Sequence, residues 1–237
     1  QYQCVETLNE LEKVIKNCEN EKIISIDTET TSIHPIEADL VGISLSLEKN
    51  KSYYIPLNHT KGKNLPINES LKKLKTLLED NSIKKVGQNI KYDFIVLKKY
   101  GITIDPYEDT MLVSYTLDAG LNRHNLDLLS EIHLGHKTIS YKDITGTGKN
   151  KVNFADVNLK EAAMYAAEDA DITLRLFNYL KNRLDQEKLN KIYEVFEKPM
   201  VKLLAEMETK GIKVNKNYLV ELSKKFQTRI ENIEKNI

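Results

Sequence analysis

The chain has 237 residues, of which 30% are charged and 41% hydrophobic, a composition ordinary for a soluble globular protein. Its 35 basic and 35 acidic side chains cancel, which argues against a protein that coats nucleic acid without specificity but allows a nucleic-acid enzyme whose metal-binding acids offset a basic face. No apolar run approaches the roughly 18 residues that span a membrane, and no secretion leader is visible, so we expect a cytoplasmic protein without a membrane partner.

The first third of the chain contains one predicted helix and three predicted strands. Apolar residues at helical spacing predict the helix over residues 7–18. The segments 22–30, 39–48 and 51–57 have the composition of strands, and residues 49–50 supply a turn between the last two. These short connections predict an antiparallel meander.

The rest of the chain is mainly helical. A short strand is expected at residues 83–89, and a polar loop at 143–151 interrupts the helices. Helices are predicted over residues 69–80, 90–101, 109–117, 125–135, 159 to about 186, and 190–237 except for 211–215. This order of elements predicts an α/β fold in which helices flank a mixed sheet.

Two acids stand at the end of the first predicted strand, in "IISIDTET". Residues two apart in a strand point to the same face, so Ser25, Asp27 and Glu29 share one face. The two carboxylates can therefore converge on one ion. The alternative is a pair of solvated acids at a strand end, and spacing alone does not separate these interpretations.

A third acid follows the short strand, in "VGQNIKYDF". Asn89 is expected to cap a helix that opens at Ile90, and Asp93 falls in the first turns of that helix. Taken alone, this pattern favours an acid that is stabilised by a helix N-terminus rather than a site residue.

The segment "YAAEDADIT" carries three more acids on one predicted helix. Asp171 lies four residues before Arg175 and is expected to form an exposed ion pair with it, and Glu168 is assigned to a solvated face. Asp169 instead falls on the apolar stripe, one turn from Tyr165. Burial of an unpaired carboxylate is costly, so Asp169 requires a cation or a strong donor nearby.

Asp27, Glu29, Asp93 and Asp169 are therefore four acids in unusual places. If they meet, each pair of charges about 5 Å apart repels by roughly 3 kcal/mol at an effective dielectric near 20. Such repulsion would consume much of a domain stability of about 5–15 kcal/mol unless protons or multivalent cations offset it. Oxygen ligands suit Mg²⁺ or Mn²⁺, and two such ions suit in-line attack on a phosphodiester.

These three motifs, in this order, resemble those of the 3′–5′ proofreading exonuclease domain of bacterial DNA polymerase I. That domain belongs to family A and is of the DEDD type with a motif tyrosine; the resemblance extends to "EDTMLVSYTLD" and "HKTISYKDITGTGKNKVNF". It implies an RNase H-like fold for residues 1–189 and, for residues 190–237, the helical and truncated start of a polymerase domain. Because the first residue is Gln1, we also expect a piece of a longer protein.

The resemblance also implies a role for each motif residue. Asp27 would bridge two divalent ions, Mg²⁺ or Mn²⁺, and Glu29 and Asp169 would complete the ligands of the first ion. Asp93 would hold the second ion, largely through water, and Tyr165 would orient the attacking water. The implied reaction releases nucleoside 5′-monophosphates from DNA and serves proofreading in replication and repair.

The implied substrate is a single-stranded or frayed 3′ end of DNA. The implied partner is the rest of the polymerase in the intact chain, and the implied location is the bacterial cytoplasm, in association with the nucleoid. Ile33 and Tyr141 would pack against the terminal bases; the alternative for Ile33 is a core position. The resemblance implies further substrate contacts by Gln88, Asn89, Tyr92 and Arg123. Four lysines cluster around the polar loop, and they either contact phosphates or form a solvated basic loop. They are Lys137, Lys142, Lys149 and Lys151.

Two other functions remain as alternatives. A catalytically silent DNA-binding or spacer module is disfavoured by the intact set of acids. An exoribonuclease similar to ribonuclease D shares the pattern of acids but is disfavoured by the polymerase-like tail, "FEKPMVKLLAEMETKGIKV".

Overall fold

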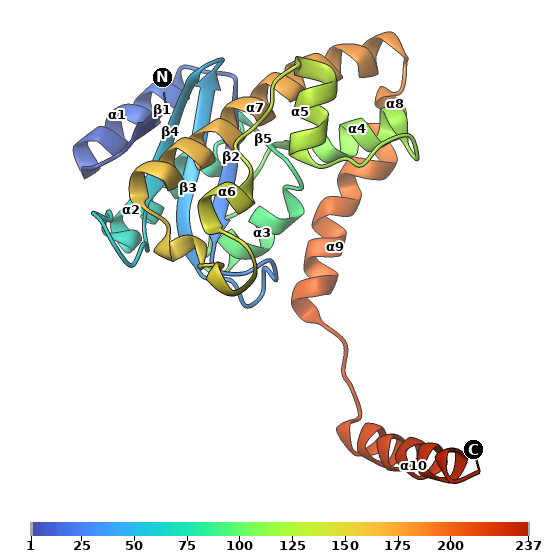
Figure 1. The fold of residues 1–237 in the computed structure, drawn as a ribbon. Coiled ribbons are helices and arrows are strands. Elements are labelled where there is room, and N and C mark those ends of the chain that lie inside the picture. The colour runs from blue at the N-terminus through green and yellow to red at the C-terminus, as the bar shows by residue number, and fades with distance from the viewer. Residues whose placement is uncertain (1, 237) are drawn as a thin grey trace. The chain divides into compact units, whose positions relative to one another are not determined.

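The structure is a computed structural model and describes residues 2–236. The chain divides into two compact units, Gln1–Glu206 and Met207–Ile237 (Figure 1). The first unit contains the sheet and most of the helices. The second contains the end of one helix and all of another.

Within residues 2–236, the strands form one six-stranded mixed sheet with the order β1-β4-β3-β2-β5-β6. The strands are β1 (Tyr2–Cys4), β2 (Ile23–Thr30), β3 (Leu40–Glu48), β4 (Lys51–Pro56), β5 (Lys84–Gly87) and β6 (Tyr107–Asp109). The pairs β2–β3 and β3–β4 are antiparallel, which confirms the predicted meander. The pairs β1–β4, β2–β5 and β5–β6 are parallel.

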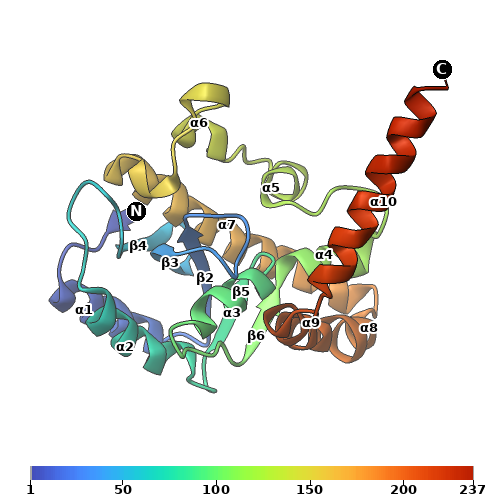
Figure 2. The same ribbon diagram turned by 90° about the horizontal axis from the view of Figure 1, so that it is seen from below.

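Helices cover both faces of this sheet (Figures 1 and 2). The helices of the first unit are α1 (Leu8–Glu19), α2 (Ile67–Leu78), α3 (Lys91–Lys98), α4 (Thr110–Asp118), α5 (Leu126–Leu134), α6 (Tyr141–Thr145), α7 (Leu159–Gln186) and α8 (Asn190–Ile192). Single turns lie at Gly148–Asn150, Phe154–Asp156 and Tyr193–Glu197. The remaining helices are α9 (Lys198–Lys210) and α10 (Lys216–Glu234).

The core is divided by the sheet. One cluster joins Ile24 and Ile26 of β2 to apolar residues of α1, α2 and α3. On the opposite face, α7 packs over the sheet with small residues such as Ala162 and Ala166, which let the helix approach closely. Since residues alternate between faces along β2, Ser25, Asp27 and Glu29 point toward α7, as the period of two predicts. The Ser25 hydroxyl donates to the Ala170 carbonyl of α7 at 2.6 Å.

The acidic end of β2 departs from regular strand geometry. The β2–β3 register shifts between Glu29 and Thr30, directly after the second acid, which is where bulges re-aim side chains. Gly42 of β3 lies opposite Glu29. A Cβ atom at Gly42 would lie 2.2 Å from the hydroxyl oxygen of Tyr54, so only glycine leaves room for the Tyr54 ring beside the acids.

Most predicted elements occur where they were expected, but three short ones were missed. The strands β1 and β6 have three residues each and carry no periodic signal. The segment expected as a polar loop begins inside α6, whose Ser140–Asp143 capping box stabilises its five residues.

Residues 190–234 are helical except at residues 211–215, as predicted. Residues 190–206 belong to the first compact unit, in which Tyr193, Val201 and Ala205 are buried. The expected domain boundary at 189/190 stays a prediction. In α10, no described side chain is buried. Among residues 2–236, no helix combines the length and apolar character that a membrane span requires.

Candidate active site

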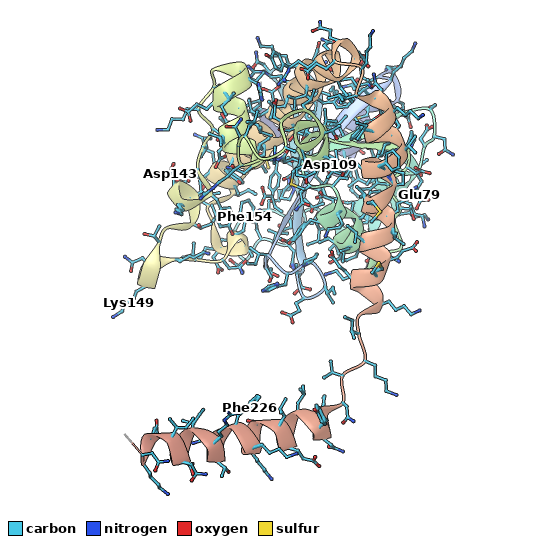
Figure 3. All side chains as sticks on the ribbon, turned by 90° about the vertical axis from the view of Figure 1, so that its right-hand side faces the viewer. Glu79, Asp109, Asp143, Lys149, Phe154 and Phe226 are labelled. Carbon is cyan, nitrogen blue, oxygen red and sulfur yellow. The ribbon has the colours of Figure 1, made fainter. Side chains whose placement is uncertain are left out.

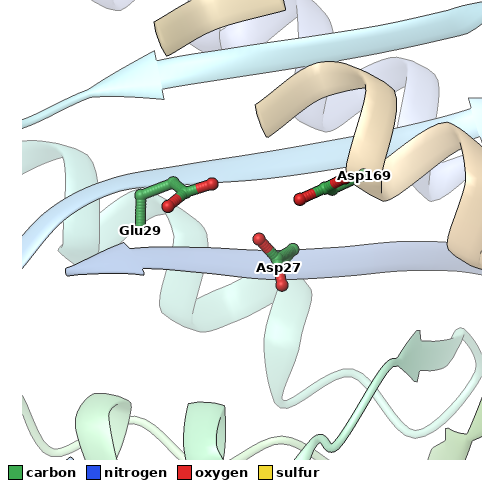
Figure 4. Close-up of side chains that lie close together, drawn as sticks. All are labelled: Asp27, Glu29 and Asp169. Carbon is green, nitrogen blue, oxygen red and sulfur yellow. The ribbon is translucent and has the colours of Figure 1, made fainter. Parts of the chain in front are cut away.

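Three carboxylates from two elements meet beside the end of β2. Asp27 and Glu29 extend from β2 and Asp169 from α7, and one oxygen of each lies within 4.8 Å of the others (Figure 4). Glu29 and Asp169 are buried, and Asp27 is partly buried. The strand period of two and the position of Asp169 on the inner stripe of α7 produce this arrangement.

The protonation of this cluster is strongly perturbed. Burial raises the pKa of Asp27 to about 7. Burial, together with the negative charge of the neighbouring acids, holds the pKa values of Glu29 and Asp169 well above their ordinary range. No lysine or arginine among the described residues forms an ion pair with these acids. The cluster therefore needs protons or added cations to relieve its repulsion.

Asp93 lies next to this cluster but is held by the other side of β2. Its Oδ1 accepts the Thr28 backbone N–H at 3.0 Å and the Thr28 hydroxyl at 2.5 Å. Burial and the charge of Asp27 raise the pKa of Asp93 well above its ordinary value. Asp93 thus stands outside the three-acid cluster yet within the electrostatic influence of Asp27.

The expected capping of α3 by Asn89 is wrong. The helix begins at Lys91 without a side-chain cap, and Asn89 adopts a left-handed conformation with φ of 59°. Asp109 accounts for this difference, because its carboxylate accepts the backbone N–H groups of Asn89 at 3.1 Å and Ile90 at 3.0 Å. The N–H groups that lead into α3 are therefore bonded by a distant acid, and the Asn89 side chain does not cap the helix.

The other two acids of "YAAEDADIT" are buried, which corrects the expected solvation of Glu168 and the expected exposure of the Asp171–Arg175 pair. Asp171 is fully buried and accepts hydrogen bonds from the Tyr2 hydroxyl and the Asn50 N–H, each at 2.8 Å, besides its 3.5 Å ion pair with Arg175. Glu168 accepts the Ile139 N–H at 2.6 Å, and its Oε1 lies 2.9 Å from His136 Nε2. These two acids tie α7 to neighbouring segments, whereas Asp169 faces the cluster.

Tyr165 lies one turn from Asp169 in α7, as predicted. Burial, and next the charge of Asp169, raise the pKa of Tyr165 far above its ordinary value, so its hydroxyl stays protonated. Its ring contacts two other aromatic rings, with centroids 6.1 Å from Phe154 and 6.0 Å from Tyr141. Phe154 is fully buried and also stacks on Tyr141 at 6.2 Å, so it supports both tyrosines.

A cleft of about 700 Å³ opens over the acids. Four of the six expected substrate contacts line it, namely Ile33, Asn89, Tyr92 and Tyr141. Ile33 is 84% exposed, which excludes the alternative of a core position. The Tyr92 hydroxyl bonds to Thr30 and to the Ser32 carbonyl, so it braces the loop that carries Ile33.

Gln88 and Arg123 lie apart from this cleft. The Gln88 amide donates to the His124 carbonyl at 2.7 Å and accepts from Thr110. Arg123 lines another hollow, together with Tyr115. A third hollow neighbours both the cleft over the acids and the hollow at Arg123. It shares Asn89 with the cleft, and it shares Met111, Leu112 and Glu197 with the hollow at Arg123. Three neighbouring hollows with shared lining residues therefore lie between the acids and Arg123.

A family model for the 3′–5′ exonuclease matches residues 2–185, most of the chain. The chain belongs to this 3′–5′ exonuclease family. This result confirms the resemblance inferred from the three motifs and identifies the chain as an exonuclease domain of the DNA polymerase I type.

Full-length relatives agree with this assignment. The exonuclease domain is 42% identical over 242 residues to DNA polymerase I of Rhizobium leguminosarum, covering 94% of this chain and 24% of that protein. It is 40% identical over 238 residues to DNA polymerase I of Borreliella burgdorferi, covering 100% of this chain and 26% of that protein. The chain thus spans about a quarter of the length of these relatives.

Solved structures establish the fold. The Pol1 POL domain of M. smegmatis, in complex with DNA primer-template and dNTP, matches with a TM-score of 0.76 at 20% identity over 97% of this chain and 36% of that chain. Brucella melitensis NrnC matches with a TM-score of 0.65 at 22% identity over 88% of this chain and 90% of that chain. Escherichia coli RNase D, an exoribonuclease, matches with a TM-score of 0.64 at 17% identity over 90% of this chain and 52% of that chain. The expected RNase H-like α/β fold is confirmed.

Three supporting residues were not found by sequence reasoning. Asp109 precedes the apolar run of α4 and accepts the N–H groups of Met111 and Leu112, so its position as an N-cap was readable from "EDTML". Thr28 of β2 donates two hydrogen bonds to Asp93 of α3, and Phe154 follows a polar loop. No local pattern marks these last two, because each acts through a partner far away in sequence.

Proposed function

We propose that this domain hydrolyses DNA from a frayed 3′ end by a two-metal mechanism and releases nucleoside 5′-monophosphates. The convergence of Asp27, Glu29 and Asp169 within 4.8 Å beside the Tyr165 hydroxyl is the observation that carries the proposal. The donor set consists only of oxygen, which fits Mg²⁺ or Mn²⁺ rather than Zn²⁺.

The acids fit a pair of divalent ions in charge as well as in chemistry. Asp27, Glu29 and Asp169 would hold one ion, and Asp93 with Asp27 would hold the other. When bound, the two ions would activate a water for attack on the terminal phosphodiester and stabilise the departing 3′ oxygen. Thr28 supports this arrangement because its two hydrogen bonds fix the carboxylate of Asp93.

Tyr165 would orient the attacking water. Its raised pKa keeps the hydroxyl neutral at physiological pH, so it can donate to an oxygen or accept from one without adding charge. Tyr141 and Ile33 expose apolar surface to the cleft and would hold the last bases. Stacking on an aromatic ring tolerates every base, as removal of any mismatched nucleotide requires.

Single-stranded DNA would enter along these neighbouring hollows. Asn89 and Tyr92 would contact the strand near the acids, whereas Arg123 would meet a phosphate farther along it. Gln88 would act mainly by holding the segment around Asn89, since its amide already has two protein partners.

The domain would proofread within a longer polymerase in the bacterial cytoplasm, close to the nucleoid. We assign residues 1–189 to the exonuclease and residues 190–237 to the start of the polymerase domain. The relatives named DNA polymerase I, of which this chain spans about a quarter, support a polymerase domain in the longer protein.

The test is an incubation of the purified domain with 3′-labelled single-stranded DNA and Mg²⁺ or Mn²⁺. We expect metal-dependent release of labelled mononucleotides, and none from the Asp27→Asn variant. A second arm with RNA of the same sequence separates this function from an exoribonuclease. Absence of mononucleotides from DNA in every divalent ion would overturn the proposal, and faster release from RNA would favour the exoribonuclease.

A further inference from the structure

The cleft over the acids contains one cationic side chain among the described residues that line it, Lys151. Its Nζ lies 5.8 Å from the centroid of the Tyr141 ring. Among residues 2–236, no acid forms an ion pair with it. The positive charge is therefore present in an acidic cleft but is not used to neutralise the acids.

The backbone around Lys151 is held in place. Its N–H donates to the Gly148 carbonyl at 3.3 Å, and the next N–H, of Val152, donates to the Thr145 carbonyl at 2.8 Å. The Asn153 amide donates to the Thr31 carbonyl at 2.7 Å, which ties this segment to the loop after β2. Lys151 thus projects from a fixed wall of the cleft and not from a free loop.

We propose that Lys151 binds a backbone phosphate of the nucleotides that occupy the cleft, next to the base that stacks on Tyr141. The inference rests on the proposed function, which supplies a DNA strand at Tyr141. An ammonium group beside an aromatic platform can meet the phosphate of a stacked nucleotide, and in single-strand binding sites these two features occur together. A cation on the wall of this cleft also attracts the phosphate backbone, in addition to the divalent ions that the acids would hold.

The neighbouring Lys149 provides a matched control. Lys149 lies two residues away and is exposed, but it does not line the cleft. Its side chain points outward from the loop (Figure 3). A Lys149→Met variant removes the same charge from the same loop, so a general electrostatic effect would appear in both variants and a specific contact only in Lys151→Met.

The first experiment measures binding of a fluorescent single-stranded oligonucleotide by anisotropy, as a function of salt. We expect Lys151→Met to weaken binding about fivefold to tenfold and to reduce the slope of log affinity against log salt by about 0.7, the value for one phosphate contact in a single strand. Lys151→Arg should restore both, and Lys149→Met should match the wild type. Equal affinities and slopes for Lys151→Met and Lys149→Met would overturn the inference.

The second experiment measures cleavage kinetics, first with normal DNA and then with DNA that carries one uncharged backbone linkage. For Lys151→Met we expect KM to rise with kcat changed less than about twofold, because a uniform binding contact is lost. Methylphosphonate linkages near the 3′ end, introduced one at a time, should include one at which wild type and Lys151→Met become equal. If the difference persists at every linkage, the phosphate contact is refuted. A wild-type domain that binds DNA but releases no mononucleotide would instead refute the proposed function and leave the binding test valid.

Discussion

The side chain and backbone of Thr28 both donate to one oxygen of Asp93, at 2.5 and 3.0 Å. This pair joins α3 to β2 at the point where the other face of the strand presents Asp27. The two faces of one strand end therefore hold both halves of the proposed metal site, and the orientation of Asp93 depends on a threonine that carries no charge.

We predict that Thr28→Val lowers the cleavage rate about tenfold to hundredfold, the range observed when a residue that orients a metal ligand is removed. Unfolding should become easier by only about 1 kcal/mol, because the backbone hydrogen bond to Asp93 remains. Steady-state kinetics and urea titration measure the two effects. Thr28→Ser keeps the hydroxyl and should remain close to wild type; a similar loss in both variants would contradict the role of the hydrogen bond.

The stability of the metal-free domain should fall as pH rises from about 5 to 8. Burial raises the folded-state pKa of Asp27 to about 7, above its unfolded value, so the folded protein binds more protons in this range. The stability that comes from the raised pKa of Asp27 is fully present below the pKa of Asp27 in the unfolded chain. It is lost as pH rises through about 7.

Asp27→Asn should remove much of this pH dependence. At pH 8 the variant should be more stable than wild type by about 2 kcal/mol, and near pH 5 the difference should be small. Urea unfolding in the presence of a chelator measures both values. A variant that is less stable than wild type at pH 8 would show that the acids are not in net repulsion.

Tyr165→Phe should slow cleavage about hundredfold while leaving metal affinity nearly unchanged, because the hydroxyl is assigned to water and not to an ion. Single-turnover kinetics and calorimetric titration with Mn²⁺ give the two quantities. Tyr179→Phe, an exposed position on the same helix, is the control. A loss of metal affinity in Tyr165→Phe would refute the assignment.

Asp109→Ala should destabilise the domain by about 3 kcal/mol. The carboxylate accepts four backbone N–H groups, two that begin α4 and two at Asn89 and Ile90, and all four would lose their partner. Asp109→Asn should cost less, since the amide oxygen can still cap α4. Equal urea midpoints for Asp109→Ala and wild type would contradict this account.

The positions of the acids could be predicted from the sequence because two regular periods determine them. The strand period placed Asp27 and Glu29 on one face, and the helical period placed Asp169 on the inner stripe of α7. Asn89 and Asp171 could not be predicted in this way. The conformation of Asn89 depends on Asp109, and the burial of Asp171 depends on hydrogen bonds from Tyr2 and Asn50, all of them distant along the chain.

The central claim is that Asp27, Glu29, Asp93 and Asp169 hold a pair of divalent ions. Crystals of the domain soaked in Mn²⁺ and a nucleoside 5′-monophosphate, with data collected near the manganese edge, test it most directly. The account predicts two anomalous peaks about 3.5–4 Å apart, with Asp27 between them and Asp93 beside the second. An anomalous map without a peak among these carboxylates, at Mn²⁺ concentrations that support cleavage, would contradict it.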